Sequence, residues 1–479
     1  MHSLGVIWTL GVLTACFGMV MMLPSLIALY DQSGHALHFV LAGAIVLLLG
    51  LIMQRVGRGA PTQLSHKDGF LIVALAWISL SLLGAIPFWT TGACVTLMDG
   101  LFESTSGLTT TGATILVGLD EMPRSILFWR SLQEWAGGMG IIVLAVAVMP
   151  LLGIGGMQLF RAESPGPTKD KLTARVTETA KMLWYIYMAM TAITTLALWW
   201  AGMGWFDALN HAMCTIAIGG FSTHDASIGY FQSTLIRDLI ILFMLLAGVN
   251  FTLHFAAIRK GFSPRIYFQD DEFIAYGKWL LLLLLLISLL VVTKPSVVWG
   301  DVLFNVVSIA TTTGFAVSDY SIWSPGVNML LLAAMFVGAC AGSTGGGMKV
   351  VRVLLLFRQG MREVRRLIHP HGVIHVKLGA SSLSLPVMQS LWGFFVLYIF
   401  CFFVVAIVVA SFGVDMLTAF AASAACITNT GPGFGEVGPA SNYLALPDGA
   451  KGALMFAMIL GRLEIFTFFA LLVPEFWRK

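Results

Sequence analysis

The stretch Thr109-Thr110-Thr111-Gly112-Ala113-Thr114 decides the fold, because three later stretches of the chain repeat its pattern. They are Ala217-Ile218-Gly219-Gly220-Phe221-Ser222, Thr311-Thr312-Thr313-Gly314-Phe315-Ala316 and Thr428-Asn429-Thr430-Gly431-Pro432-Gly433. In the first three, an Asp stands 13 positions before the glycine, at positions 99, 207 and 301. In the fourth, Asp415 precedes its glycine by 16 positions, which we interpret as about one extra helical turn. The chain is therefore built from four internal repeats.

The composition places these repeats in a lipid bilayer. Of the 479 residues, 58% are hydrophobic and 11% are charged, and the mean hydropathy is +0.88. An average soluble domain has roughly 25% charged residues, so this chain lacks the polar surface that water requires. Apolar runs long enough to cross a hydrocarbon core of ~30 Å recur along the whole sequence. We count about ten spans and about four shorter apolar segments.

The Lys and Arg residues indicate which ends of the spans face the cytoplasm. Five segments hold 21 of the 27 basic residues, namely 55–67, 161–181, 259–278, 349–377 and 478–479. Positive residues near span ends stay inside, so both termini are expected in the cytoplasm. The intervening loops carry mainly Asp and Glu, and an acidic outer face would concentrate cations at a pore mouth.

Each repeat has one apolar span before its Thr/Gly-rich stretch and one after it. The pairs are 69–90 and 125–152, 182–202 and 234–258, 275–293 and 327–358, and 387–412 and 450–473. Two crossings return the chain to one side, so the units share one orientation, unlike inverted repeats. We expect an all-α polytopic membrane protein with four tandem span/pore-helix/span repeats around a central pore. The expected units are two extra N-terminal spans in 1–60, and repeats in 61–160, 161–262, 263–368 and 369–479.

The segments between each Asp and its Thr/Gly-rich stretch are predicted to be re-entrant half-helices. Their roughly ten residues are too few to cross the bilayer. We expect the Asp to cap the helix N-terminus, and favour this role over direct contact with an ion. The partly negative C-terminal end then points toward the bilayer centre, where it favours a cation.

Four non-helical stretches at membrane depth imply a shared axis. Such backbone is tolerated only where it is buried in protein or lines a watery cavity. Rings of carbonyl oxygens can replace the hydration shell of K⁺, and glycine supplies the unusual dihedral angles that this requires. One such glycine alone is typical of close helix packing, but four at equivalent positions favour a filter. The predicted K⁺-binding residues are Thr110, Thr111, Gly112, Ile218, Gly219, Gly220, Thr312, Thr313, Gly314, Asn429, Thr430 and Gly431.

Together with AGSTGGGMKV at 341–350 and GRLEIF at 461–466, these stretches resemble the Trk/Ktr/HKT superfamily of K⁺ transporters. Over essentially the whole chain the resemblance is strongest to the bacterial TrkH/TrkG membrane subunits. It implies K⁺ uptake across the bacterial inner membrane, a homodimer, and a cytosolic nucleotide-binding regulatory subunit of the TrkA type. Gly112 implies the K⁺ type, since plant relatives with serine there favour Na⁺. Ala217 and Ile218 depart from the threonine pattern, so repeat two cannot contribute those hydroxyls.

The second span of repeat three is interrupted by a segment that we interpret as a gate. Five glycines lie within 338–347, and each costs a helix roughly 1 kcal/mol relative to Ala. Arg462 lies in the last apolar span, so it should face the interior and pair with Glu464 or with carbonyls of this segment. TrkH-like proteins place their equivalent arginine beside this loop, which implies a positive barrier to cations. The predicted gate is Gly345, Gly346, Gly347 and Arg462; a plain hinge is the alternative.

Other functions are less well supported by the sequence. No site for ATP hydrolysis and no histidine spacing typical of metal ligands is visible, so we expect no enzyme, no cofactor and no nucleic-acid partner, with K⁺ as the transported ion. A K⁺ symporter coupled to H⁺ or Na⁺ is the main alternative. The basic segment 358–366 could bind a cytosolic partner or anionic membrane lipid. Glu134 is a further ionisable group in a predicted span, with a structural or a coupling role left open.

Overall fold

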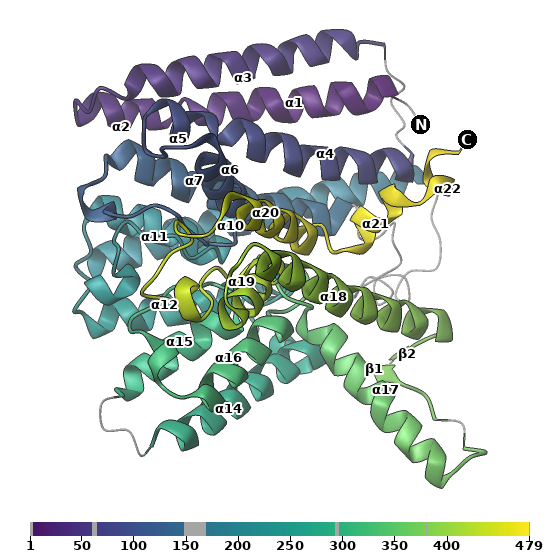
Figure 1. Ribbon diagram of the computed structural model, residues 1–479. Helices are drawn as coiled ribbons and strands as arrows, with labels where there is room; N and C mark the ends of the chain where they lie inside the picture. Colours follow the sequence, from purple (N-terminus) through teal and green to yellow (C-terminus); the bar gives the residue numbers. More distant parts are fainter. Residues whose placement is uncertain are drawn as a thin grey trace.

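The computed structural model describes residues 3–59, 65–147, 169–292, 297–372, 374–379 and 381–478 (Figure 1). Residues 148–152 of one predicted span and 161–168 of one basic segment lie outside them. The described residues are mostly helical. Their strands are the antiparallel pair β1 (Lys377–Leu378) and β2 (Ser381–Ser382). The predicted all-α fold class is confirmed.

Two N-terminal helices form a peripheral pair before the first repeat. In Figure 1, α1 (Ser3–Met21) and α3 (Ala36–Val56) lie side by side at the top, joined by the short α2 (Pro24–Tyr30). Their backbones approach closely at glycines, because a Cβ atom on Gly11 would lie only 2.7 Å from the backbone nitrogen of Gln54. Small residues at such crossings are typical of helix packing in membranes.

Each repeat contains a first span, a short pore helix and a second span, with 3₁₀ turns in the loops between elements. The first spans are α4 (His66–Gly84), followed by α5 (Ile86–Thr90), α10 (Lys169–Trp200), α14 (Asp271–Val291) and α18 (Leu385–Ser411). The pore helices are α6 (Leu97–Leu108), α11 (Trp205–Ala217), α15 (Trp299–Ala310) and α19 (Met416–Ile427). The second-span helices are α7 (Arg124–Ala147), α12 (Thr234–Ala247), α13 (Phe251–Arg259), α16 (Pro325–Val337), α17 (Val350–Ile368), α20 (Asp448–Arg462) and α21 (Phe466–Leu472), with α22 (Pro474–Trp477) last. The 3₁₀ turns are η1 (Leu119–Glu121), η2 (Ser227–Tyr230), η3 (Pro264–Gln269), η4 (Tyr320–Ile322) and η5 (Gly435–Val437).

The pore helices do not all begin as the sequence predicts. Asp415 is the N-cap of α19 and accepts a hydrogen bond from the backbone nitrogen of Thr418 at 3.0 Å. The Asp residues of the other repeats, 99, 207 and 301, instead stand at the third helical position. In α6, Thr96 is the cap. The predicted capping role is therefore wrong for three of the four Asp residues.

This difference removes the extra helical turn that we expected in repeat four. Counted from the first residue of the pore helix, the glycine follows by 15 positions in every repeat: 97 to 112, 205 to 220, 299 to 314 and 416 to 431. The longer Asp spacing arises because that Asp precedes its helix rather than standing inside it. The four units thus match in length between the start of the pore helix and the glycine.

The second spans are broken in repeats two, three and four, whereas the sequence predicts a break only in repeat three. The axes of α12 and α13 meet at 92°, and those of α20 and α21 at 109°. Within the described residues, six helices are long and apolar enough to cross a membrane, or eight if each bent pair is one span. That number is below our count of about ten, because breaks shorten helices such as α16, which has 13 residues.

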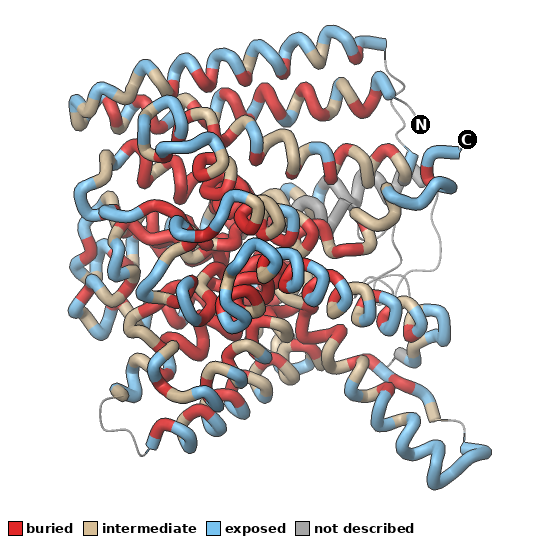
Figure 2. Tube along the Cα trace, in the orientation of Figure 1, coloured by how far each residue is buried: buried red, intermediate tan, exposed pale blue. Residues whose placement is uncertain are grey.

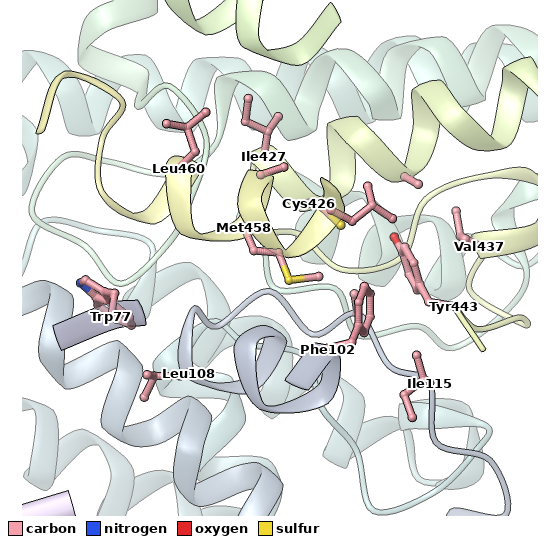
Figure 3. Close-up of a cluster of buried hydrophobic side chains, with 14 of the residues drawn as sticks. Trp77, Phe102, Leu108, Ile115, Cys426, Ile427, Val437, Tyr443, Met458 and Leu460 are labelled. Atoms are coloured by element: carbon pink, nitrogen blue, oxygen red, sulfur yellow. The ribbon is translucent and has the colours of Figure 1, made fainter. Parts of the chain in front are cut away.

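Buried residues concentrate around the four pore helices, and exposed ones lie on the peripheral helices (Figure 2). Between repeats one and four, the rings of Phe102 and Tyr443 lie 5.3 Å apart, and Figure 3 shows them facing each other. The outward face of α14 is apolar, with Leu281, Leu285 and Leu289 each more than half exposed. An apolar outward face is the arrangement expected of a helix surrounded by lipid.

Candidate functional site

All four pore helices end in the same backbone conformation. Two residues before each glycine, a residue other than glycine adopts a positive φ, and the glycine then adopts one too. The φ angles are 52° and 77° for Thr110 and Gly112, 54° and 88° for Ile218 and Gly220, 63° and 88° for Thr312 and Gly314, and 54° and 95° for Asn429 and Gly431. A left-handed conformation costs an L-residue roughly 1–2 kcal/mol, and such strain is typical of functional sites.

Hydrogen bonds hold these strained helix ends in place. The backbone nitrogen after each left-handed residue donates to the carbonyl five positions earlier, at 2.8 Å from Thr111 to Ser106 and at 2.9 Å from Gly219 to Cys214. The same bond is 2.8 Å long from Thr313 and from Thr430. This pattern is the Schellman motif, which usually has glycine at the left-handed position. Here the left-handed position is occupied by Thr, Ile or Asn, so each of these turns carries a side chain where glycine would have none.

The four Thr/Gly-rich stretches form a closed ring in chain order. A Cβ atom added to the glycine of one repeat would collide with the carbonyl oxygen that directly precedes the glycine of the next repeat, and the fourth repeat closes onto the first. The pairs are Gly112 with Gly219, Gly220 with Thr313, Gly314 with Thr430, and Gly431 with Thr111. Glycine is therefore required at all four positions, by its φ angle and by the approach of the neighbouring backbone.

Threonine hydroxyl pairs support three of the four stretches. The side-chain oxygens of Thr109 and Thr111 are 2.7 Å apart, those of Thr311 and Thr313 are 2.7 Å apart, and those of Thr428 and Thr430 are 2.8 Å apart. Repeat two has Ala217 and Gly219 at these positions, so it lacks the pair. The predicted filter residues do not include Thr109, Thr311 and Thr428, although their place in the repeated motif is a sufficient signal.

The Gly-rich segment lies directly against the pore-helix ends of the ring. The backbone nitrogen of Gly346 donates to the hydroxyl of Thr312 at 2.7 Å, and that of Gly347 donates to the carbonyl of Thr428 at 3.0 Å. A Cβ atom on Gly345 would lie 2.9 Å from the carbonyl oxygen of Thr311. The predicted gate glycines and the predicted filter residues therefore touch.

Arg462 joins this segment to two other repeats. Its guanidinium donates to the carbonyl of Thr344 at 3.0 Å and to the carbonyl of Gly137 at 3.1 Å. The side chain is buried and lies over the ring of Trp77. Glu464, the other partner that we considered, binds Arg352 at 2.5 Å instead. Arg462 thus connects α20, the Gly-rich segment and α7.

Lys349 is a second cation at the same segment, which the sequence indicates only as one of the cytoplasmic basic residues. It is buried, has a φ of 77°, and donates through its ammonium group to the carbonyl of Gly345. A Lys that closely follows three glycines within an apolar context is the available signal. Two buried cations therefore bind adjacent carbonyls of the predicted gate.

The break in repeat two interlocks with the other end of the Gly-rich segment. The backbone nitrogen of Cys340 donates to the carbonyl of Gly248 at 3.0 Å, and that of Phe251 donates to the carbonyl of Gly342 at 3.0 Å. The carboxylate of Glu272 accepts from the backbone nitrogen of Ala341 at 2.7 Å. The segment is consequently held by groups from repeats two, three and four.

Toward the N-terminal ends of the pore helices, on the side predicted to face outward, acidic residues are partly neutralised by basic partners. Asp99 forms a buried ion pair with Lys451 at 2.6 Å, and Asp301 contacts Arg237 at 3.3 Å. The face predicted to lie outside is thus less negative than the Asp and Glu residues of the loops suggest. Within the described residues, no group of three or more His, Cys, Asp or Glu side chains is arranged to hold a metal ion.

His224 connects the loops that follow the Thr/Gly-rich stretches of repeats one and two. Its Nδ1 lies 2.5 Å from Asp120, and its ring stacks on Tyr230 with centroids 3.5 Å apart. Burial alone would lower the pKa of His224, but hydrogen bonds with Asp207 and Asp120 raise it above its usual value. The hydrogen bond with His224 in turn lowers the pKa of Asp120. The protonated form of His224 paired with Asp120 therefore stabilises this contact between repeats.

Comparison with known proteins agrees with this architecture. A family model described as TrkH, cation transport protein, matches residues 36–299 and 274–478. The Trk system potassium uptake protein TrkH of Vibrio parahaemolyticus is 47% identical over 487 residues and covers 100% of both chains. The protein of that name from Halomonas elongata is 48% identical over 483 residues and covers 98% of both.

A solved structure shows the same fold. The crystal structure of the potassium transporter TrkH from Vibrio parahaemolyticus matches with a TM-score of 0.93 at 45% identity, and covers 100% of both chains. The resemblance to the Trk superfamily that the repeated stretches indicate is thereby confirmed. This chain is a multi-pass membrane protein of the TrkH family of cation transport proteins.

Proposed function

We propose that this protein takes up K⁺ across the inner membrane of a bacterium, by channel-like permeation through the ring of four Thr/Gly-rich stretches. The observation that carries the proposal is the ring itself, in which each glycine backs onto a carbonyl of the next repeat. Relatives that match the whole chain are named potassium uptake proteins, which supports K⁺ as the ion. The twelve predicted filter residues are the ones we assign to K⁺ coordination.

The membrane potential is a sufficient driving force in this proposal. Moving one charge across 100 mV is worth about 2.3 kcal/mol, which supports roughly fiftyfold accumulation. Uptake of this size requires neither ATP hydrolysis in this chain nor an organic cofactor. K⁺ enters as the transported ion and its hydration shell is replaced by carbonyl oxygens of the ring.

The Gly-rich segment and Arg462 form the gate of the proposed pathway. Arg462 binds a carbonyl at Thr344, next to glycines that touch the ring, so its positive charge would oppose a cation leaving the filter. Moving the segment would break hydrogen bonds to Thr312 and Thr428 and change the pore-helix ends. Gating and the filter are mechanically connected in this arrangement.

Regulation would come from the cytoplasmic side. In Figure 1, α1 begins and α22 ends on one side of the molecule, toward which α17 also extends. The exposed basic residues of α17, which include Arg365 and Arg366, offer a docking face for a nucleotide-binding subunit of the TrkA type or for anionic lipid. We assign this side to the cytoplasm, and retain the homodimer and the five units bounded at residues 60, 160, 262 and 368 as parts of the proposal.

The test is the flux of K⁺, Rb⁺ and Na⁺ in reconstituted vesicles, for the wild type and for Gly112→Ser. A side chain at Gly112 would collide with Gly219, so the variant should lose K⁺ selectivity. Gly300→Ser is the matched control, because a Cβ atom at that position meets nothing within 4 Å. Equal selectivity in Gly112→Ser and the wild type would refute the filter assignment. Transport of K⁺ with H⁺ or Na⁺ in a fixed ratio, without linear single-channel currents, would instead support the coupled symporter.

A further inference from the structure

Repeat two lacks the threonine pair that supports the filter backbone in the other repeats, and α7 supplies a carboxylate at that place. Glu134 is fully buried, with both oxygens within hydrogen-bond distance of the backbone nitrogen of Phe221, at 3.1 and 3.2 Å. A Cβ atom on Gly219 would collide with this carboxyl group. The glutamate therefore fills the space that a side chain at position 219 would need.

A second charged residue on the same face of α7 also binds the stretch of repeat two. Arg130, one helical turn before Glu134, donates to the carbonyl of Ser222 at 2.8 Å. It also binds Glu103 at 2.8 Å and the hydroxyl of Thr114 at 3.1 Å, which belong to repeat one. Arg130 is thus paired with Glu103, and within the described residues Glu134 forms no ion pair within 4.0 Å.

The equivalent position in repeat four shows that a carboxylate is not required by the fold. Gly137 of α7 backs onto the carbonyl at the end of α6, and Gly461 of α20 backs onto the carbonyl at the end of α19. Three positions before each glycine stand Glu134 and Met458, and both are buried. Figure 3 shows the Met458 side chain extending from α20 toward α6. The stretch of repeat four, whose Asn429 side chain binds the carbonyl of Met458, has its threonine pair. The stretch of repeat two, which binds Glu134, lacks such a pair.

We propose that Glu134 completes the filter in repeat two, as a positioning residue for its backbone and as the negative charge that balances a bound K⁺. A buried acid without a basic partner is costly in a membrane, and a cation held at the neighbouring ring offsets that cost. This inference rests on the proposed function. It makes the affinity for K⁺, and the preference for K⁺ over Na⁺, depend on the charge of Glu134.

The experiment compares Glu134→Gln with Glu134→Asp in reconstituted vesicles. Gln keeps an acceptor for the backbone nitrogen of Phe221 but removes the charge, so the apparent KM for Rb⁺ should rise at least tenfold. The ratio of Rb⁺ to Na⁺ flux should also fall. Asp keeps the charge and should stay within threefold of the wild type. Trp135→Phe is the matched control, since Trp135 is the next residue of α7 and binds Thr191 of α10 instead.

A binding measurement on purified protein covers variants that transport too little to be analysed. K⁺ should raise the melting temperature of the wild type and of Trp135→Phe more than Na⁺ does, because a ligand stabilises the state that binds it. This difference should disappear in Glu134→Gln. A wild-type difference between K⁺ and Na⁺ in Glu134→Gln, or an equal loss of this difference in Glu134→Gln and Glu134→Asp, would overturn the role of the charge. Absence of selective K⁺ flux in the wild type would instead refute the proposed function itself.

Discussion

Ile218 is the residue that best shows how much strain the ring contains. It is β-branched and completely buried, yet it adopts a φ of 54°, a conformation that such side chains rarely occupy. The turn persists because hydrogen bonds on both sides of Ile218 hold the backbone in place. The backbone nitrogen of Gly219 is bound to Cys214, and the carbonyl of Ile216 accepts from Thr344 of the Gly-rich segment at 2.9 Å. Strain of this kind is expected where a backbone must present carbonyls in one direction.

The His224–Asp120 contact predicts a pH dependence of stability. Folding raises the pKa of His224, so its contribution is complete below the usual 6.5 and is lost as the pH rises through the raised value. Folding lowers the pKa of Asp120, so that contribution is present above 3.8 and is lost at lower pH. Asp207 lies 3.6 Å from the same ring and acts in the same direction. Because Asp120 is 43% exposed, the pair is worth only about 0.2–1 kcal/mol.

The measurement is the melting temperature of the wild type and of His224→Gln between pH 5 and pH 9 in detergent. The wild type should be more stable by one or two degrees, roughly the effect of that energy on a protein of this size, near pH 6. The difference should shrink toward alkaline pH. A constant difference across the range would mean that the contact acts through packing on Tyr230 alone.

At the scale of secondary-structure elements, the breaks in the second spans of repeats two, three and four contact one another at the Gly-rich segment. The break between α12 and α13 binds one end of the Gly-rich segment, through Gly248 and Phe251. The end of α20 binds its centre through Arg462, and Glu464 in the following turn binds Arg352 of α17. None of these breaks can move without changing hydrogen bonds of the segment. The proposed gate is therefore a single unit assembled from repeats two, three and four.

This arrangement predicts that the two buried cations hold the gate closed together. Arg462→Ala removes the hydrogen bonds to Thr344 and Gly137, and Lys349→Met removes the one to Gly345. Each change should raise the basal Rb⁺ flux severalfold. Because both act on adjacent carbonyls, the double variant should show less than the product of the two effects.

Arg366→Ala is the control for a lost positive charge, since Arg366 is exposed on α17 and pairs with Glu363 of the same helix. Its basal flux should equal that of the wild type. Flux that is unchanged in Arg462→Ala, in protein that remains monodisperse, would contradict the gate. Flux that increases equally in all three variants would point to a general effect of surface charge.

At the scale of the whole molecule, an all-α membrane fold with repeated Thr/Gly-rich stretches could be predicted from sequence, because spacing and hydropathy are local signals. The 15-residue distance from the start of the pore helix to the glycine could not be found by aligning Asp residues, since Asp415 caps its helix and Asp99 does not. The bend after α20 depends on positive φ angles at Glu464 and Ile465, which no propensity favours. Tertiary contacts impose such conformations, so only the structure reveals them.

The twelve predicted filter residues follow from the same reasoning, whereas the residues that lie behind them do not. A threonine or glycine at a repeated position can be recognised from a single sequence, because the four stretches can be compared with one another. Glu134 acts on a distant part of the chain through its contact with Phe221, and no spacing connects the two residues. Lys349 binds Gly345, four positions earlier in the same segment, but this contact is not part of the repeated pattern. Groups that differ between repeats carry no repeated pattern. They are also the groups that make the ring of four repeats asymmetric.

The orientation of the whole molecule is tested by labelling from one side of the membrane. Asp448 begins α20 at the end that we assign to the outside, and Arg366 lies near the end of α17 that we assign to the cytoplasm. Both side chains are more than half exposed, so cysteines there should react readily. The background is Cys16→Ser, because the other five native cysteines are buried. In intact cells, a membrane-impermeant maleimide should label the Asp448→Cys variant, and should label Arg366→Cys only after permeabilisation. The reverse pattern would invert the molecule, and would place the Gly-rich segment on the outer side of the ring.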